Sequence, residues 1–503
     1  MEQSYTLEKI EYFLEARQQY ESILGMLCSE KFIGEEHGVI EGWLRTEGNE
    51  LCRRLLQGHL DRLAAEESVK DVVIDAKGLE HREHRFNTSR QLMTVFGEVT
   101  VRRIKYSKPG KRSLFPLDAM LNLPEDKYSH GLQKIVAEEA SKGSFDSCVE
   151  VVRRDTGGVV PKLQAEQLVS KIAKDFAGYY STKRVTAKPE KNSLLALTTD
   201  GKGVVMRPEG LRQATRNAQL KSENKLKTRL SKGEKANRKR MATVASVYYV
   251  ARHFRSAEQI MGESEENAAA KPRPTDKRVW ASIERDADVV VGDLFDEALR
   301  RDPELKMTWV LLVDGQQQQL NNIRARIREH NLAGHVTLIL DFIHVLEYLW
   351  SAAYCFHPEG SQKAEDWVRE RALRILNGKS SHVAAGIRSS ASKMKLKLAD
   401  RAAADKCSDY LLKYSSMLRY DKYLKEGFPI ATGVIEGACR HLVKDRMDIT
   451  GARWGLTGAE AVLKLRSLSS SGDMDQYWQY HTKQELLRNH KVHYMDFSVA
   501  TAA

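Results

Sequence analysis

Two short apolar runs, each followed by an aspartate, constrain the fold of this chain more than any other feature. The runs are WVLLV before Asp314 and VTLIL before Asp341, and a polar segment of helical pattern separates them. Short runs rich in Val, Leu and Ile indicate buried strands, so residues 309–350 predict a strand-helix-strand unit. Ligands bind beyond the carboxyl ends of strands in open α/β sheets, so each aspartate is either a metal ligand or a turn former.

A third run of this kind, LLALTT before Asp200, favours a shared function for the three aspartates. The glycines in the following GKGVVM predict a tight turn at Asp200 and a return strand. MATVASVYYV predicts a third strand, and residues 276–302 and 320–330 predict helices. The expected fold is therefore α/β with the order β-β-β-α-β-α-β. This is the layout of a ribonuclease-H-like core, in which the first and fourth strands each supply one aspartate.

The charge of the chain favours an anionic partner. At 503 residues with a formal net charge of +12, we expect several domains and a nucleic-acid partner. No apolar run approaches the roughly 18 residues of a membrane-spanning helix, and the N-terminal sequence does not read as a signal peptide. The 6 cysteines form no C-x-x-C pair, which argues against structural zinc and fits a reducing cytoplasm.

Changes in hydrophobic pattern and charge divide the chain into regions. In chain order we expect an N-terminal helical region (1–70), a small β meander (71–120), a helix-turn-helix-like DNA-binding domain (121–182), the first part of the core (190–344, with a basic insertion at 211–240), an all-α insertion (345–429), the second part of the core (430–490) and a tail (491–503).

The helix-turn-helix-like region predicts a DNA-reading helix. Ser144 can cap one helix, and the segment GGVVP at 157–161 ends it before the next. Amides and amines, which reach base edges and phosphates, lie on the polar side of that next helix: Lys162, Gln164, Gln167 and Lys171. Helices with such polar faces are also common in proteins that do not bind DNA.

Two further segments are strongly basic. The exit of the meander, 102–112, forms either a solvated strand face or a phosphate-contacting surface. The insertion carries a run of cations suited to a DNA backbone: Lys225, Lys227, Arg229, Lys232, Lys235, Arg238, Lys239 and Arg240.

Three acids suit metal-dependent phosphodiester chemistry. Two divalent ions about 3.5 to 4 Å apart can activate the attacking oxygen and stabilise the leaving one. Mg²⁺, with Mn²⁺ as an alternative, prefers carboxylates, waters and phosphates. We assign Asp200, Asp314 and Glu436 to this role. Glu436 is preferred over Asp445 because its apolar neighbours make a solvent-facing position harder to explain.

The sequence resembles the bacterial DDE insertion-sequence transposases, and in particular the ISKra-type family. The resemblance lies in LPEDKYSHGLQ, TTDGKGVVM, DFIHVLEYLW, AYCFHPEG and GVIEGACRHLVKDRMDITGARWGLTGAEAVLKLRSL, and it spans residues 121–489. More distantly, Asp341-Phe-Ile-His344 is similar to the C/D-x-x-H signature of Mutator-like transposases. That similarity implies that Asp314 is the second catalytic aspartate and that Asp341 and His344 are accessory; Asp341 is the alternative catalytic residue. His344 could also simply satisfy a hydrogen bond in the core.

The resemblance implies a transposase that binds double-stranded DNA at the terminal repeats of its element and at the target, as a homo-oligomer. Beyond Glu436, a basic surface with one aromatic residue is expected to contact a DNA terminus: Arg440, Lys444, Arg453 and Trp454. Two other functions use the same residues differently. One is a DNA-binding regulator built on an inactive nuclease fold, and the other is a structure-specific nuclease without strand transfer.

Overall fold

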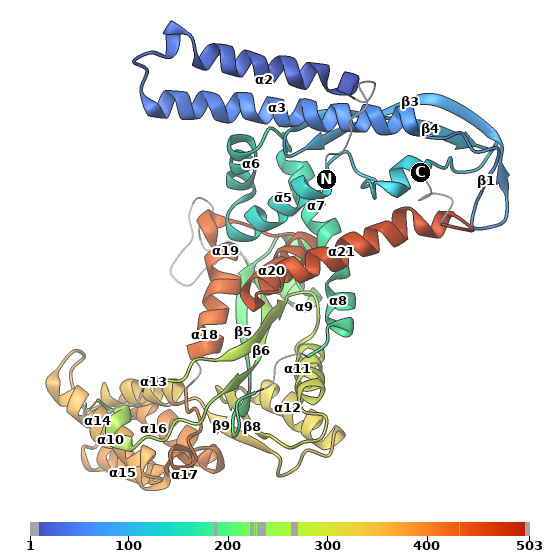
Figure 1. Cartoon of the computed structure of the whole chain (residues 1–503). Helices are drawn as coiled ribbons and strands as arrows, with labels where there is room; N and C mark the ends of the chain where they lie inside the picture. The colour runs from blue at the N-terminus through green and yellow to red at the C-terminus, as the bar shows by residue number, and fades with distance from the viewer. Residues whose placement is uncertain are drawn as a thin grey trace. The chain divides into compact units, whose positions relative to one another are not determined.

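The chain folds into two compact units. The computed structural model describes residues 10–185, 189–221, 226, 228, 238–262, 270–431 and 433–497. Unit 1 combines Met1–Thr182 with Asp473–Ala503, and unit 2 is Lys183–Gly472 (Figure 1). Residues 473–490, which we expected in the core, therefore belong with the N-terminal unit.

Unit 1 begins with two long helices, α2 (Leu14–Leu27) and α3 (His37–Glu66). The short helix η1 (Glu11–Phe13) precedes α2 and packs closely on α3. A Cβ on Gly58 of α3 would lie only 2.3 Å from the carbonyl oxygen of Tyr12. The side chain of Gln57 on α3 hydrogen-bonds both backbone groups of Thr100. The helical pair is thereby tied to the neighbouring β structure.

The predicted meander is a long hairpin beside a separate small ribbon. Strands β3 (Glu83–Thr94) and β4 (Gly97–Ser107) pair antiparallel, and Gly97 at the turn has a φ of 122°. Strands β1 (Val73–Ile74) and β2 (Glu80–His81) pair only with each other. The first part of the predicted tail is packed against unit 1, where Tyr494 and Phe497 join a core cluster with Val73, Ile104 and Tyr106.

The rest of unit 1 is helical: α4 (Pro116–Met120), α5 (His130–Lys142), α6 (Phe145–Asp155), α7 (Lys162–Ile172), α8 (Phe176–Thr182) and α21 (Met474–Asn489). Ser144 caps α6 as predicted, its hydroxyl accepting the Ser147 N–H at 3.0 Å. Gly157 lies between α6 and α7 where a Cβ would come within 2.3 Å of the Phe96 carbonyl oxygen, so this turn requires glycine.

Unit 2 is built on a five-stranded mixed sheet. Its strands are β5 (Leu194–Val205), β6 (Lys239–Val250), β7 (Thr275–Ser282), β8 (Thr308–Val313) and β9 (Val336–Leu340). The spatial order is β7-β6-β5-β8-β9. Strands β5, β8 and β9 run parallel, while β6 is antiparallel to both β5 and β7. The chain is thus a mixed α/β protein.

Two local predictions in this sheet are wrong. LLALTTDGKGVV makes no turn: it is one strand of 12 residues, in which Gly201 pairs with Thr243 and Gly203 with Met241. A Cβ on Gly203 would lie 2.9 Å from the Lys239 side chain on the paired strand, so this glycine leaves room for that side chain. Residues 275–282, expected to start a helix, form β7 instead. The helix α11 (Ala287–Arg301) begins after it.

Helices cover the sheet. Helices α11 and α12 (Gln317–Glu329) connect β7 to β8 and β8 to β9, and they pack on each other. A helix formed by α18 (Gly433–Ala438), the π-helical segment η6 (Cys439–Lys444) and α19 (Asp445–Met447) contacts β5 through η6. Two short helices, α9 (Gln213–Leu220) and α10 (Ala257–Ile260), lie in connections.

Helix α20 (Leu456–Ser471) closes the free edge of the sheet at β7. The outward N–H groups of Val279, Ala281 and Ile283 bind side chains of α20, at 3.0 Å to Ser471 Oγ, 3.3 Å to Ser467 Oγ and 2.9 Å to Glu460 Oε2. An unpaired strand edge would otherwise expose these donors to other chains.

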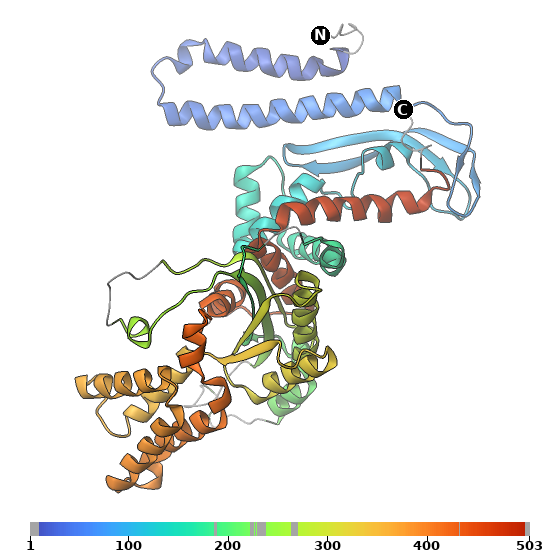
Figure 2. The same ribbon diagram turned by 60° about the horizontal axis from the view of Figure 1, so that its bottom comes forward.

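Between β9 and α18 the chain forms a cluster of helices, α13 (Phe342–Ala353), α14 (Gln362–Leu376), α15 (Ser380–Lys393), α16 (Leu398–Lys413) and α17 (Tyr420–Lys425) (Figures 1 and 2). Three tyrosine hydroxyls tie it to the ends of β8 and β9. They donate from Tyr410 to Asp314 O at 2.9 Å, from Tyr414 to Gly315 O at 2.5 Å and from Tyr420 to Leu340 O at 2.7 Å. The cluster therefore positions the strand ends.

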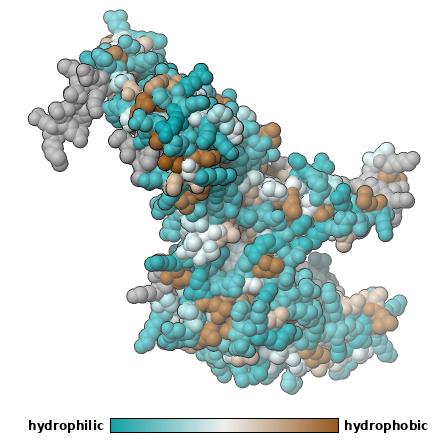
Figure 3. All heavy atoms as spheres, turned by 90° about the vertical axis from the view of Figure 1, so that its right-hand side faces the viewer, coloured by the Kyte–Doolittle hydropathy of each residue, from teal (hydrophilic) through white to brown (hydrophobic). Residues whose placement is uncertain are grey.

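Within the described residues, no helix has both the length and the apolarity needed to cross a bilayer. On the face drawn in Figure 3, apolar residues form small separate patches in a mainly hydrophilic surface.

Candidate functional site

The three strand-associated aspartates lie at one level of the sheet. Thr198 of β5 pairs with Leu312 of β8, and Leu312 pairs with Ile339 of β9, all in parallel register. Counting two residues onward along each strand gives Asp200, Asp314 and Asp341. Each aspartate therefore follows its strand's registered residue by two positions, and all three lie towards the same end of the parallel strands.

Asp200 lies within β5, where the strand passes from buried to half-buried residues. Its Oδ1 accepts the N–H of Gly201 at 2.6 Å. Its Oδ2 accepts the thiol of Cys439 at 3.2 Å, which joins β5 to the helix that carries Glu436. Burial first, and then the charge of Asp200, raise the pKa of Cys439 well above its usual range. The thiol therefore stays protonated and acts as a hydrogen-bond donor.

Asp314 follows β8 and borders a cavity. It is half-buried, and its Oδ1 accepts the N–H of Gln316 at 2.8 Å. The cavity has a volume of about 460 Å³, and its lining includes acids, His344, two lysines and three tyrosines: Asp314, Gly315, Gln316, His344, Glu347, Tyr348, Lys406, Asp409, Tyr410, Lys413 and Tyr414. The rings of Tyr348 and Tyr410 stack with centroids 3.9 Å apart. The hollow thus offers carboxylates, cations and aromatic faces together.

Asp341 is buried and serves as a helix cap. Its exposed fraction is 1%, and its Oδ1 accepts the N–H of Ile343 at 2.8 Å as the N-cap of α13. A side-chain cap of this kind stabilises a helix by about 1 kcal/mol. Asp341 and Asp314 thus make the same kind of bond to the backbone two residues on, but Asp341 is buried whereas Asp314 is half-buried and lines the cavity.

Glu436 is exposed, so the argument that apolar neighbours would keep it from solvent was wrong. Helical geometry turns Ile435 and Ala438 into the protein while Glu436 points outward. Its carboxyl still lies among the other acids. Partial burial, and then the charges of Asp341, Glu347 and Asp200, raise its pKa, while His344 acts in the opposite direction.

His344 lies between the acids and does not fill a core position. Its Nδ1 is 3.0 Å from Glu347 Oε2, and its side chain is 33% exposed. Burial lowers the pKa of His344, but the hydrogen bond with Glu347 and the charges of Asp341 and Asp314 outweigh it and raise the pKa overall. His344 therefore carries more positive charge near neutral pH than a free histidine.

A π-helical segment follows Glu436 directly. π-Bulges within α-helices occur frequently at functional sites. In the segment Cys439–Lys444, the carbonyl groups of His441 and Leu442 accept hydrogen bonds from Arg466 of α20, the latter at 2.8 Å. This bulge holds Cys439 against Asp200. The sequence offered no signal for Cys439 or Arg466, because their importance depends on the irregular turn.

The candidate DNA-reading helix is α7, and two of its cations are paired. Lys162 lies 2.7 Å from Asp146, and Lys171 lies 2.5 Å from Asp126. Gln167 is exposed and Gln164 is half-buried. Exposed ion pairs are worth little, so phosphates can compete for both lysines.

The basic insertion falls mainly beyond the described residues. This holds for Lys225, Lys227, Arg229, Lys232 and Lys235. Lys239 is exposed, and Arg238 is half-buried. Arg240 is structural, since it donates to the carbonyl oxygens of Ile283 at 2.7 Å and Glu284 at 2.9 Å. Its assignment to DNA contacts was wrong, because these backbone acceptors already engage its guanidinium.

The surface beyond Glu436 is basic, but the aromatic residue predicted to belong to it is buried. Arg440, Lys444 and Arg453 are exposed, whereas Trp454 is 7% exposed and was wrongly assigned to it. The Trp454 indole donates to the Met447 carbonyl oxygen at 3.0 Å, and its backbone N–H donates to Val205 at 3.1 Å. Trp454 therefore connects the end of β5 to the end of α19.

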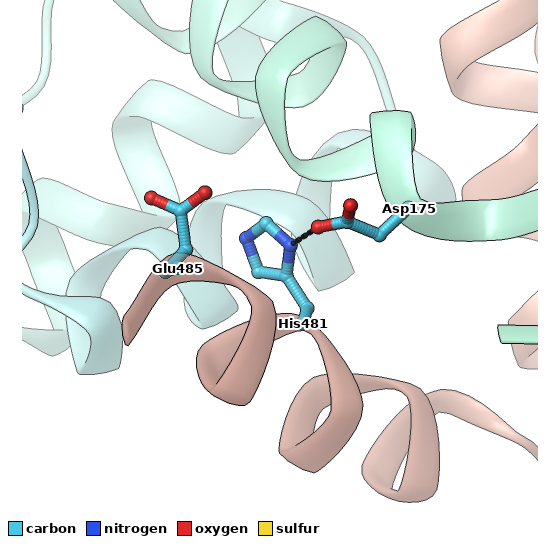
Figure 4. Close-up of side chains that lie close together, drawn as sticks. All are labelled: Asp175, His481 and Glu485. Atoms are coloured by element: carbon cyan, nitrogen blue, oxygen red, sulfur yellow. Dashed lines mark hydrogen bonds and ion pairs between the residues drawn. The ribbon is translucent and has the colours of Figure 1, made fainter. Parts of the chain in front are cut away.

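One compact group of potential metal ligands was not anticipated, and it lies in unit 1 (Figure 4). The side chains of Asp175, His481 and Glu485 place ligand atoms within 4.8 Å of one another. No other group of three possible ligands is this compact among the described residues, so Asp200, Asp314 and Glu436 are further apart than that in this structure. Asp175 accepts from His481 at 2.7 Å and pairs with Arg488 at 2.5 Å. Burial opposes ionisation of Glu485, yet Lys174, 2.8 Å away, and its neighbours lower its pKa to about 2. Cations of the chain already balance these acids.

No protein-family model matches this chain, and no curated protein matches its sequence.

Proposed function

We propose that this chain is a DNA transposase that cleaves and joins strands at a ribonuclease-H-like core in unit 2. The observation that supports the proposal is the parallel register of β5 and β8, in which Thr198 pairs with Leu312, so that Asp200 and Asp314 each follow that pair by two residues. The sheet order β7-β6-β5-β8-β9 supports it, because β5 and β8 are then the first and fourth strands in sequence and neighbours in space. The third acid, Glu436, comes from a helix that reaches Asp200 through Cys439.

The donor set fits Mg²⁺. Asp200, Asp314 and Glu436 offer only oxygen ligands, and the pKa of Glu436 is raised by burial and by neighbouring carboxylates, a repulsion that a bound cation would relieve. These residues would hold the ions, with Asp341 as the alternative to Asp314. When bound, such ions activate the attacking oxygen and neutralise charge on the phosphate.

The remaining groups of the site suit a DNA strand. Lys406 and Lys413 line the cavity beside Asp314 and would attract phosphates. His344, with its raised pKa, places a positive charge and a hydrogen-bond donor next to Asp314. Cys439 holds the carboxylate of Asp200 in position through its thiol.

The test is cleavage of duplex DNA that carries the sequences flanking the gene, with binding measured in parallel. Asp200→Asn, Asp314→Asn and Glu436→Gln should each lower the cleavage rate at least about 100-fold, because even groups that only position metal ligands cost 10- to 100-fold. DNA affinity should stay within about twofold. Asp445→Asn is the matched control, since Asp445 lies on the same helix and pairs outward with His441 at 2.9 Å.

Three results would change the assignment. Cleavage by Asp314→Asn but not by Asp341→Asn would make Asp341 the second catalytic aspartate. Cleavage by the unaltered chain without strand joining would indicate a structure-specific nuclease. Specific binding without cleavage under any divalent metal would refute the enzyme and indicate a DNA-binding regulator.

A further inference from the structure

Unit 1 contains a cavity of about 340 Å³, and none of the candidate catalytic acids is among its lining residues. Its walls come from the β3–β4 hairpin, the segment 112–125, and the end of α21 with the following turn. The lining is rich in cations: Arg90, Arg103, Lys105, Arg112, His490 and His493 are among its residues, with the acids Asp118 and Glu125. Ligand pockets begin at about 300 Å³, so this volume accommodates a small group.

The acids do not balance the cations of the cavity. Asp118 is buried and pairs with Arg103 at 2.8 Å, with Arg90 further away at 3.8 Å. Arg90 also donates to the carbonyl oxygens of Pro124 at 3.0 Å and Asp126 at 2.6 Å, so Lys105 and Arg112 are the cations most available to a ligand. Glu125 lies 3.7 Å from Arg112, but its side chain is 71% exposed, so this pair is weak. Within the described residues, Lys105 has no acidic partner in ion-pair distance. Four permanent cations against the two carboxylates of the lining leave a formal charge of about +2, which the carboxyl of Glu67 near Arg103 reduces.

Two histidines also line the cavity, and burial is the main reason for their lowered pKa. Burial lowers the pKa of His490, and the charges of Arg112 and Arg90 lower it further, against the effects of Asp118 and of the hydrogen bond to Leu123. Burial and the charge of Arg112 also lower the pKa of His493, against Glu125. Both imidazoles are therefore neutral near pH 7.

We propose that this cavity is a binding site for a phosphate group. Arginine presents planar forks of N–H donors that match phosphate oxygens, and a net positive cavity attracts a dianion. The sequence predicted that the basic segment 102–112 forms either a solvated strand face or a phosphate-contacting surface. Three of its residues, Arg103, Lys105 and Arg112, line this cavity. The site belongs to unit 1 alone and does not depend on the proposed chemistry at Asp200.

Binding of inorganic phosphate to the full chain, measured by calorimetry at constant ionic strength, tests the proposal. Lys105→Gln and Arg112→Gln should each weaken binding about tenfold, the effect of losing one charge-assisted hydrogen bond. Lys108→Gln and Lys111→Gln remove the same charge from the same basic segment outside the cavity lining, so they should change affinity less than twofold. Equal loss in all four variants, or no saturable binding by the unaltered chain, would overturn the proposal.

Oligonucleotides with and without a 5′-phosphate identify the source of the phosphate. A preference for the phosphorylated end that Arg112→Gln removes supports a nucleic-acid terminus as the ligand. If Lys105→Gln and Arg112→Gln weaken binding of inorganic phosphate but leave oligonucleotide binding unchanged, the ligand is a small phosphorylated molecule.

Sulfate provides a further test, because its charge does not change between about pH 5.5 and 7.5. A bound dianion raises the pKa of His490 and His493, so binding takes up protons and sulfate affinity should increase as the pH falls. Arg90, Arg103, Lys105 and Arg112 stay charged in this range, whereas burial raises the pKa of Asp118, so Asp118→Asn is needed to separate its proton uptake from that of the histidines. An affinity that is independent of pH would overturn the placement of the anion beside these histidines.

Discussion

Glu460 of α20 gives the most direct physical test of the structure. Its carboxylate is 3% exposed and accepts hydrogen bonds from three donors at the edge of the sheet. The donors are the N–H of Ile283 at 2.9 Å, the N–H of Glu284 at 3.1 Å and the hydroxyl of Ser282 at 3.0 and 3.1 Å to the two oxygens. Glu460→Ala would leave these donors without their acceptor.

The expected cost follows from the burial of the donors. Ser282 and Ile283 are buried, whereas Glu284 is exposed and its N–H can bind water. An unsatisfied buried polar group costs about 1–3 kcal/mol, so we expect unit 2 to lose roughly 2–4 kcal/mol, allowing for some hydration. Each 1 kcal/mol shifts the melting temperature of a domain of this size by about 2–3 °C, so unit 2 should melt roughly 4–12 °C lower.

Urea and thermal unfolding of the full chain, followed by circular dichroism, would measure this loss. Glu460→Gln keeps one acceptor oxygen and should lose about half as much, and Glu365→Ala, at an exposed position of α14, should change stability by less than about 0.5 kcal/mol. A loss below about 1 kcal/mol for Glu460→Ala would refute the role of α20 in satisfying the β7 edge.

The remaining predictions concern the candidate site and DNA recognition. Mg²⁺ and Mn²⁺ should support cleavage while Ca²⁺ permits assembly without turnover, and full activity after exhaustive chelation would contradict the proposed mechanism. Because the folded state raises the pKa of Glu436, its contribution to stability is complete at low pH and is lost as the pH rises through that pKa. Thermal melts should therefore show Glu436→Gln gaining stability relative to the unaltered chain between pH 4 and pH 8, and equal curves would contradict the raised pKa. Changing Gln164 and Gln167 to Ala should reduce preference for terminal repeats by about 1–3 kcal/mol per bidentate base contact with little change in salt dependence. Neutralising cations in 225–240 should instead weaken binding to all DNA and flatten the salt dependence, and binding isotherms at several salt concentrations would distinguish the two.

The strand count of the sheet was predicted correctly through two errors that cancel. The glycines after Asp200 suggested a turn, which added a strand that does not exist. The prediction of a single helix over residues 276–302 removed β7. Local pattern cannot separate a glycine required by a turn from one that leaves room for a side chain on the paired strand, because both depend on what lies opposite it.

Local sequence alone determined the buried strands that precede Asp314 and Asp341, the cap at Ser144 and the helical nature of 345–429. These features depend on apolar runs, helical periodicity and side-chain hydrogen bonds to the adjacent backbone, all of which act within a few residues. Tertiary structure alone decided the exposure of Glu436, the burial of Trp454 and the return of residues 473–497 to the N-terminal unit. It also decided the contact between Cys439 and Asp200, since they are separated by 239 positions and meet through a π-helical turn held by Arg466. Which of these groups meet depends on strand register and helix packing, and neither is encoded in any short stretch of the chain.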